Sequence, residues 1–126
     1  MREQLPATVE SVARARHAVR RFARGLDVDV EGITLAVSEA VANAVAHAYG
    51  DAEPGTIDVS GTAAPDEVAI VVRDRGRGMA APAVHPGAGF GIEIIRRLAQ
   101  KVDVDDGDPG VALTMRFRRG GAWSAS

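Results

Sequence analysis

The run VSEAVANAVAHAY, residues 37–49, places polar side chains at a four-residue spacing among residues that are mostly alanine and valine. On a helix, Glu39, Asn43 and His47 form one row, because residues four apart differ by only about 40° in direction. The row borders the apolar face of the helix instead of lying opposite it. A carboxylate there can accept a proton, and an asparagine oxygen suits Mg²⁺. The alternative is an ordinary boundary row that hydrogen-bonds to a neighbouring loop.

His47 by itself does not predict a metal site. A Zn²⁺ site needs further strong ligands. The sequence has no cysteine, and the other two histidines, His17 and His85, lie in unrelated segments. A packing or hydrogen-bonding role is therefore the favoured interpretation of His47.

Apolar periodicity predicts helices and strands on both sides of this row. The first helix is expected to take Thr8 as its N-cap, to bury Val9, Val12 and Val19, and to stop at Gly25. The expected helices are residues 8–24, about 28–49 and about 90–100. The expected strands are residues 56–62, 68–74, 102–104 and 111–118.

The order of these elements is helix, helix, strand, strand, helix, strand, strand. Most of the strands are joined by short turns and lack crossover helices, so a doubly wound sheet is disfavoured. We expect an α+β fold: a two-layer sandwich with a mostly antiparallel sheet covered on one face by helices. Residues 1–119 are expected to form a single domain, and residues 120–126 a flexible tail.

Composition narrows the classes of function. A chain of 126 residues makes one ordinary domain, and 46% apolar residues are enough for one core. A formal net charge of −2 leaves no excess of cations for nucleic-acid phosphates. The polar start has no apolar signal core, and no apolar stretch is long enough to span a membrane. We expect a cytoplasmic protein without direct nucleic-acid or membrane partners.

Two glycine-containing segments follow the polar helix. DRGRG, residues 74–78, comes directly after an apolar strand and sets a carboxylate beside backbone that a flat ligand can approach. GAGFG, residues 87–91, opens the third helix, where backbone N–H groups and the helix N-terminus favour a phosphate. Taken separately, both motifs are weak. The first is compatible with a plain turn, and the second lacks the context of a dinucleotide site or a P-loop.

The order of the three motifs resembles the Bergerat ATP-binding fold, which histidine kinases and type II topoisomerases share. That fold carries Glu-x-x-x-Asn on a helix, Asp-x-Gly-x-Gly after a strand and Gly-x-Gly-x-Gly at a helix start. Within it, residues 37–49 are similar to the bacterial anti-sigma-factor serine/threonine kinases, relatives of the histidine-kinase ATPase domain. The opening residues 5–7 and the closing strand also fit, so the resemblance covers nearly the whole chain.

The resemblance implies a role for each matching residue, with ATP and Mg²⁺ as cofactors. Glu39 would be the general base, and Asn43 the Mg²⁺ ligand. Asp74 would bind the amine of adenine. Glycines would shape the adenine pocket (Gly76 and Gly78) and lie along the phosphates (Gly87, Gly89 and Gly91).

The resemblance also implies a function. In this family, ATP phosphorylates a serine or threonine of an anti-anti-sigma protein of the STAS type. The kinase also acts as an anti-sigma factor by sequestering a sigma factor. Relatives suggest a homodimer.

Two departures from the family's pattern concern nucleotide affinity. The family's last strand usually starts Gly-Thr-Thr, whereas Val111 and Ala112 carry no hydroxyl and Thr114 comes two residues later. The segment between the glycine motifs, residues 79–86, is short for an ATP lid. We therefore expect an ATP affinity of roughly tens to hundreds of micromolar.

Two other functions compete with the kinase hypothesis. A degenerate relative would bind nucleotide weakly or not at all and would sequester a sigma factor or STAS partner without efficient phosphotransfer. Intact Glu39 and Asn43 favour the kinase over this module. A sensor histidine kinase is disfavoured, because no helix with a phosphoacceptor histidine precedes the motifs.

Overall fold

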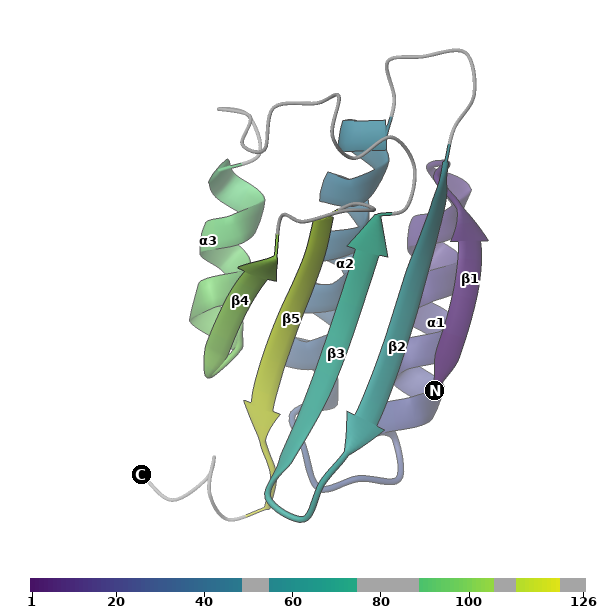
Figure 1. Ribbon diagram of the computed structural model, residues 1–126. Coiled ribbons are helices and arrows are strands. Elements are labelled where there is room, and N and C mark those ends of the chain that lie inside the picture. The colour runs from purple at the N-terminus through teal and green to yellow at the C-terminus, as the bar shows by residue number, and fades with distance from the viewer. Residues whose placement is uncertain (49–54, 75–88, 106–110, 121–126) are drawn as a thin grey trace.

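The computed structural model describes residues 1–48, 55–74, 89–105 and 111–120. Within them, a five-stranded antiparallel sheet in the order β1-β2-β3-β5-β4 is covered on one face by helices (Figure 1). The expected two-layer α+β sandwich is confirmed. The elements are β1 Arg2–Pro6, α1 Glu10–Ala23, α2 Val30–Ala48, β2 Thr56–Ala63, β3 Glu67–Asp74, α3 Gly89–Leu98, β4 Lys101–Asp105 and β5 Val111–Arg118.

The hairpin of β2 and β3 forms the middle of the sheet and follows from alternation along the sequence. Val59 pairs with Val72, and residues directly opposite each other on antiparallel strands point to the same face. Ile57, Val68 and Ile70 are fully buried on this face, whereas their chain neighbours are more exposed. The alternation therefore fixes which face of the sheet the helices cover.

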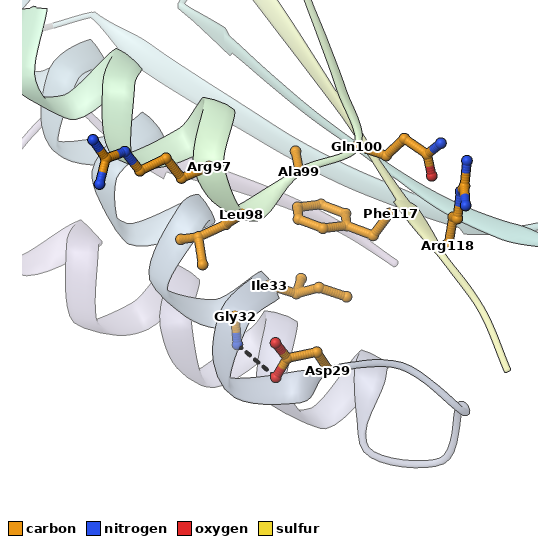
Figure 2. A pocket seen from close by; sticks show the side chains of 9 residues that line it. All are labelled: Asp29, Gly32, Ile33, Arg97, Leu98, Ala99, Gln100, Phe117 and Arg118. Carbon is orange, nitrogen blue, oxygen red and sulfur yellow. Dashed lines mark hydrogen bonds between the residues drawn. The ribbon is translucent and has the colours of Figure 1, made fainter. Parts of the chain in front are cut away.

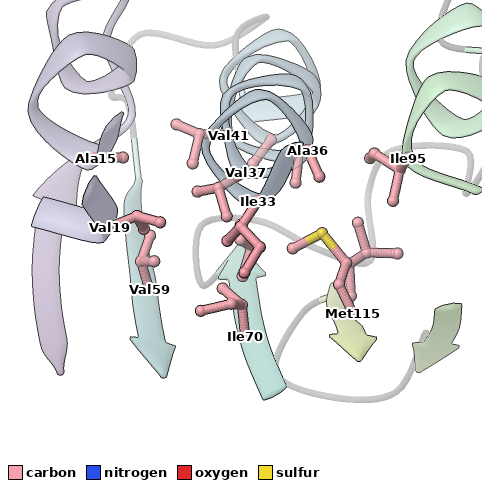
Figure 3. Close-up of a cluster of buried hydrophobic side chains, with 14 of the residues drawn as sticks. Ala15, Val19, Ile33, Ala36, Val37, Val41, Val59, Ile70, Ile95 and Met115 are labelled. Atoms are coloured by element: carbon pink, nitrogen blue, oxygen red, sulfur yellow. The ribbon is translucent and has the colours of Figure 1, made fainter. Parts of the chain in front are cut away.

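Helix α2 lies across the centre of the sheet, between α1 and α3. Figure 3 shows Ile33 and Val37 of α2 above Ile70 of β3 and Met115 of β5. All four are fully buried. Each such side chain contributes about 1.5–3 kcal/mol through removal from water, so this layer stabilises the helix that carries the polar row.

The first strand was not predicted from the sequence. β1 is an edge strand that pairs antiparallel with β2, Leu5 lying opposite Ile57. Arg2, Gln4 and Pro6 are exposed, and Leu5 is the strand's only fully buried residue. One buried side chain in five residues is too weak a pattern to distinguish a strand from a polar terminus.

Helix α1 differs from the prediction at its start and on its buried face. The N-cap is Val9, without a side-chain cap hydrogen bond, so the prediction of Thr8 as N-cap is wrong. Val9 is 64% exposed. Val19 is buried as expected and Val12 is partly buried, and the fully buried residues are four apart: Ser11, Ala15, Val19 and Ala23. Helix α1 contacts α2, β1 and β2, and the hydroxyl of Ser11 donates a hydrogen bond to the carbonyl of Pro6 in β1.

The end of β5 is tied to the loop between α1 and α2. Arg119 Nε donates to a carboxylate oxygen of Asp27 at 2.8 Å, and the Gly120 N–H donates to the Asp27 carbonyl at 2.7 Å. The hydrogen bond from Arg119 is the main cause that lowers the pKa of Asp27. Gly120 has φ = +61°, which a side chain would strain. Residues 121–126 of the expected tail lie outside the described residues.

None of the described helices combines the length and the apolar character needed to cross a membrane.

Candidate functional site

Three of the segments singled out in the sequence meet at one end of the sandwich. Figure 1 shows that α2 ends, β3 ends and α3 begins at the same end of the molecule. Asp74 is the last residue of β3 and Gly89 the first of α3, and Asn43 lies five residues before the last residue of α2. They are well separated in the sequence, and the antiparallel topology brings them to one edge.

Glu39 and Asn43 lie on the side of α2 that faces α3. Figure 3 shows Ala36 of α2 pointing towards Ile95 of α3. Residues three and seven positions later lie within about 60° of Ala36 around the helix, so Glu39 and Asn43 share its side. Both are half-buried, and neither side chain makes a hydrogen bond to another described residue. The carboxylate and the amide are thus not used by the described part of the fold. The side chain of His47 lies outside the described residues.

Asp74 is the last residue of β3, and its side chain is on the helix-covered face of the sheet. It follows Val68, Ile70 and Val72 at the two-residue spacing of a strand and is only 6% exposed. Among the described residues it is the sole buried Asp or Glu. A carboxylate is therefore held at the end of the core where α2 ends and α3 begins.

Helix α3 begins at the expected glycine motif. Its first residue is Gly89, and Gly91 follows within the first turn. The first turn contains no acidic side chain. The N–H groups at the start of a helix lack intrahelical partners and favour an anion. Gly76, Gly78 and Gly87 lie outside the described residues, so their roles stay predictions.

The pairing of β3 with β5 places only one of the two positions without a hydroxyl, Val111 and Ala112, on the face of Asp74. Val111 lies directly opposite Asp74, and Ala112 lies opposite Arg73. Directly paired residues point to the same face, so Val111 shares the face of Asp74 and Ala112 points to the other side of the sheet. Thr114 pairs with Val71 and also points away from Asp74. A hydroxyl on the face of Asp74 therefore requires a substitution at position 111 rather than 112.

The family model for the histidine kinase-like ATPase domain matches residues 5–117. The chain belongs to this family. The family implies ATP as the ligand.

Curated relatives of this histidine kinase-like ATPase domain carry two kinds of name. The serine-protein kinase RsbW of Oceanobacillus iheyensis is 30% identical over 130 residues, which is 89% of this chain and 82% of the relative. The anti-sigma F factor of Pasteuria penetrans is 42% identical over 83 residues, which is 63% of this chain and 55% of the relative. The match thus spans about half the length of the second relative and most of the first.

Solved structures agree on the fold. The RsbU and RsbW domains of a Mycobacterium tuberculosis protein match with a TM-score of 0.74 and 26% identity, over 94% of this chain and 32% of that chain. The histidine kinase domain of a blue-light activated histidine kinase from Erythrobacter litoralis matches with a TM-score of 0.61. It is 21% identical over 91% of this chain and 62% of that chain, which shows the shared fold alone.

Proposed function

We propose that this domain is an ATP-dependent protein serine/threonine kinase that acts as an anti-sigma factor in the cytoplasm. Its substrate would be an anti-anti-sigma protein of the STAS type, and it would sequester a sigma factor. The observation that carries the proposal is that α2, the helix with Glu39 and Asn43, ends at the same end of the sandwich where β3 ends in Asp74 and α3 begins. The names of the relatives, serine-protein kinase and anti-sigma F factor, support the two halves of the proposal.

Glu39 is the general base in this proposal. It accepts the proton of the substrate's serine or threonine hydroxyl as that oxygen attacks the γ-phosphorus of ATP. The bond from the γ-phosphorus to the bridging oxygen breaks, and ADP leaves. Phosphoryl transfer depends mainly on positioning and on charge stabilisation. A half-buried carboxylate on a rigid helix is suited to that positioning.

Asn43 is the proposed protein ligand of Mg²⁺. The described residues contain no group of three or more His, Cys, Asp or Glu that could hold a metal ion. This fits Mg²⁺, which is usually held by one or two protein oxygens together with substrate phosphates and water. Bound to Asn43 and the phosphates, the ion would neutralise charge that develops during transfer.

Asp74 is the proposed reader of the base. Its buried carboxylate would accept a hydrogen bond from the exocyclic amine of adenine, where guanine has a carbonyl. Gly76 and Gly78 would shape the pocket around the base. The start of α3, with Gly89 and Gly91, would direct N–H groups at the phosphates, and Gly87 would extend that cradle.

The test of the kinase proposal is phosphotransfer by Glu39→Gln. The measurement is transfer of labelled γ-phosphate to a STAS protein at saturating Mg·ATP. We expect a rate about 10²- to 10⁴-fold below wild type with nucleotide binding retained, because a base is lost and the shape is kept. Glu31→Gln is the matched control, since Glu31 is an exposed glutamate of the same helix. A Glu39→Gln rate within a few-fold of wild type would remove Glu39 from the mechanism.

A binding module without efficient phosphotransfer is the second candidate. The observation that favours it is Val111, which presents a methyl-bearing side chain opposite Asp74 where the family pattern places a hydroxyl. Such a module would bind a sigma factor or STAS protein equally well with and without ATP, and the two proteins would show no transfer. Sedimentation of the purified protein would test the homodimer that the resemblance suggests.

A further inference from the structure

A cavity of about 370 Å³ lies at the end of the sandwich opposite the proposed ATP site. It forms where α2 begins and where α3 and β5 end (Figure 2). We call it the distal pocket. The lining residues used below are Ile33, Leu98, Phe117, Asp29, Arg97 and Arg118. None of these residues belongs to the motifs that the proposed kinase reaction uses.

The floor of the distal pocket is apolar. Figure 2 shows Leu98, Phe117 and Ile33 grouped between α2, α3 and β5. Ile33 and Phe117 are almost fully buried, and Leu98 is half-buried. An apolar floor of this kind accepts a large apolar side chain, which is how the central anchors of protein interfaces bind.

The rim of the distal pocket is cationic at two opposite ends. Figure 2 shows Arg97 at one end and Arg118 at the other, with the apolar floor between them. Both are exposed, and within the described residues neither forms an ion pair. Glu67, the strand neighbour of Arg118, instead binds Arg116 at 2.6 Å. Two uncompensated cations thus flank an apolar floor on a chain whose net charge is −2.

Asp29 restricts where an acidic ligand can lie. Its carboxylate accepts a hydrogen bond from the Gly32 N–H at 3.1 Å at the start of α2, which holds the negative charge on a third side of the pocket. Acidic groups are repelled there and attracted to Arg97 and Arg118. The two arginines are on opposite sides of the floor, so a single small anion cannot lie against both.

We propose that the distal pocket is a docking site for an extended segment of a partner protein. The segment inserts one large apolar side chain against Phe117 and Leu98 and places acidic residues towards Arg97 and Arg118. The proposal goes beyond the kinase reaction and requires neither ATP nor Glu39. Absence of peptide binding would therefore contradict the docking site alone, and absence of phosphotransfer would contradict the kinase proposal alone.

The test uses a fluorescein-labelled peptide with one central phenylalanine between two pairs of glutamates, titrated by fluorescence anisotropy without nucleotide. We expect saturable binding that the double variant Arg97→Glu, Arg118→Glu weakens about tenfold or more, since both rim charges are reversed. The matched control is Arg14→Glu, Arg21→Glu, which reverses two exposed arginines of α1 and should change affinity less than about twofold. Replacing the peptide's phenylalanine with alanine should also weaken binding about tenfold.

Four results would overturn the proposal. The first is no binding to the wild type at millimolar peptide. The second is equal affinity for the rim and control variants, which would place the peptide elsewhere. The third is equal affinity for the alanine peptide, which would mean simple charge attraction. The fourth is a change of oligomeric state in the rim variant without peptide binding, which would make the pocket an interface between copies of this chain.

Discussion

Position 111 offers a test of the site geometry through Val111→Thr. Val111 lies directly opposite Asp74 and is half-exposed, so a threonine fits the strand and directs its hydroxyl to the face of the proposed adenine pocket. One new hydrogen bond contributes about 0.5–1.5 kcal/mol net, which is roughly a two- to tenfold gain in affinity. Isothermal titration calorimetry with Mg·ATP, on the wild type and on Val111→Thr, measures the gain in affinity.

Ala112→Thr is the matched control for Val111→Thr. It adds the same hydroxyl one residue later, on the face of the sheet that carries Arg73. We expect no gain in ATP affinity, and a loss of stability because Ala112 is 4% exposed. If Ala112→Thr tightened ATP binding as much as Val111→Thr, the assignment of Asp74 and Val111 to one face of an adenine pocket would be refuted.

Three further predictions concern base recognition, an ion pair and the core. Asp74→Asn should weaken ATP binding about ten- to a hundredfold, and GTP should bind poorly to the wild type; equal ATP and GTP affinities would exclude Asp74 as the reader of the base. The hydrogen bond from Arg119 lowers the pKa of Asp27 in the folded protein. The ionised carboxylate therefore stabilises the fold at a pH above its ordinary pKa of 3.8, and this stabilisation is lost as the pH falls through the lower pKa of the folded protein. The difference in urea midpoint between wild type and Asp27→Asn should therefore shrink between pH 5 and pH 3, measured at about half-unit steps, and a constant difference would contradict the ion pair. Ile70→Ala should lower the free energy of unfolding by about 2–5 kcal/mol, while exposed Val9→Ala stays within about 0.5 kcal/mol; similar effects at both positions would contradict the packing of β3 under α2.

The sequence alone predicts the elements in which apolar residues recur at the spacing of a helix or a strand. The face of α2 with Ile33 and Val37, and the alternation of β2 and β3, are written in the order of residues because burial selects one side of each element. The same order placed Glu39 and Asn43 in one row, and both are half-buried in the structure.

Features that depend on partners distant in the sequence could not be predicted in this way. The edge strand β1 exists because Leu5 pairs with Ile57, which the polar terminus does not reveal. The burial of Val19 on α1 was predicted, but that of Ser11 and Ala15 was missed, because small residues give only a weak apolar pattern. The choice of Val111 over Ala112 depends on the register with β3, which alternation within one strand leaves undetermined.

Binding of Mg·ATP to the purified wild-type protein tests the central claim most directly. We predict a saturable calorimetric titration with a dissociation constant of roughly tens to hundreds of micromolar. At a hundredfold excess over that constant, the bound nucleotide should stabilise the fold by about 2.7 kcal/mol and raise the melting temperature by roughly 10 °C. Absence of both the binding heat and the melting shift at millimolar Mg·ATP would contradict the claim that Asn43, Asp74 and the start of α3 form an ATP site.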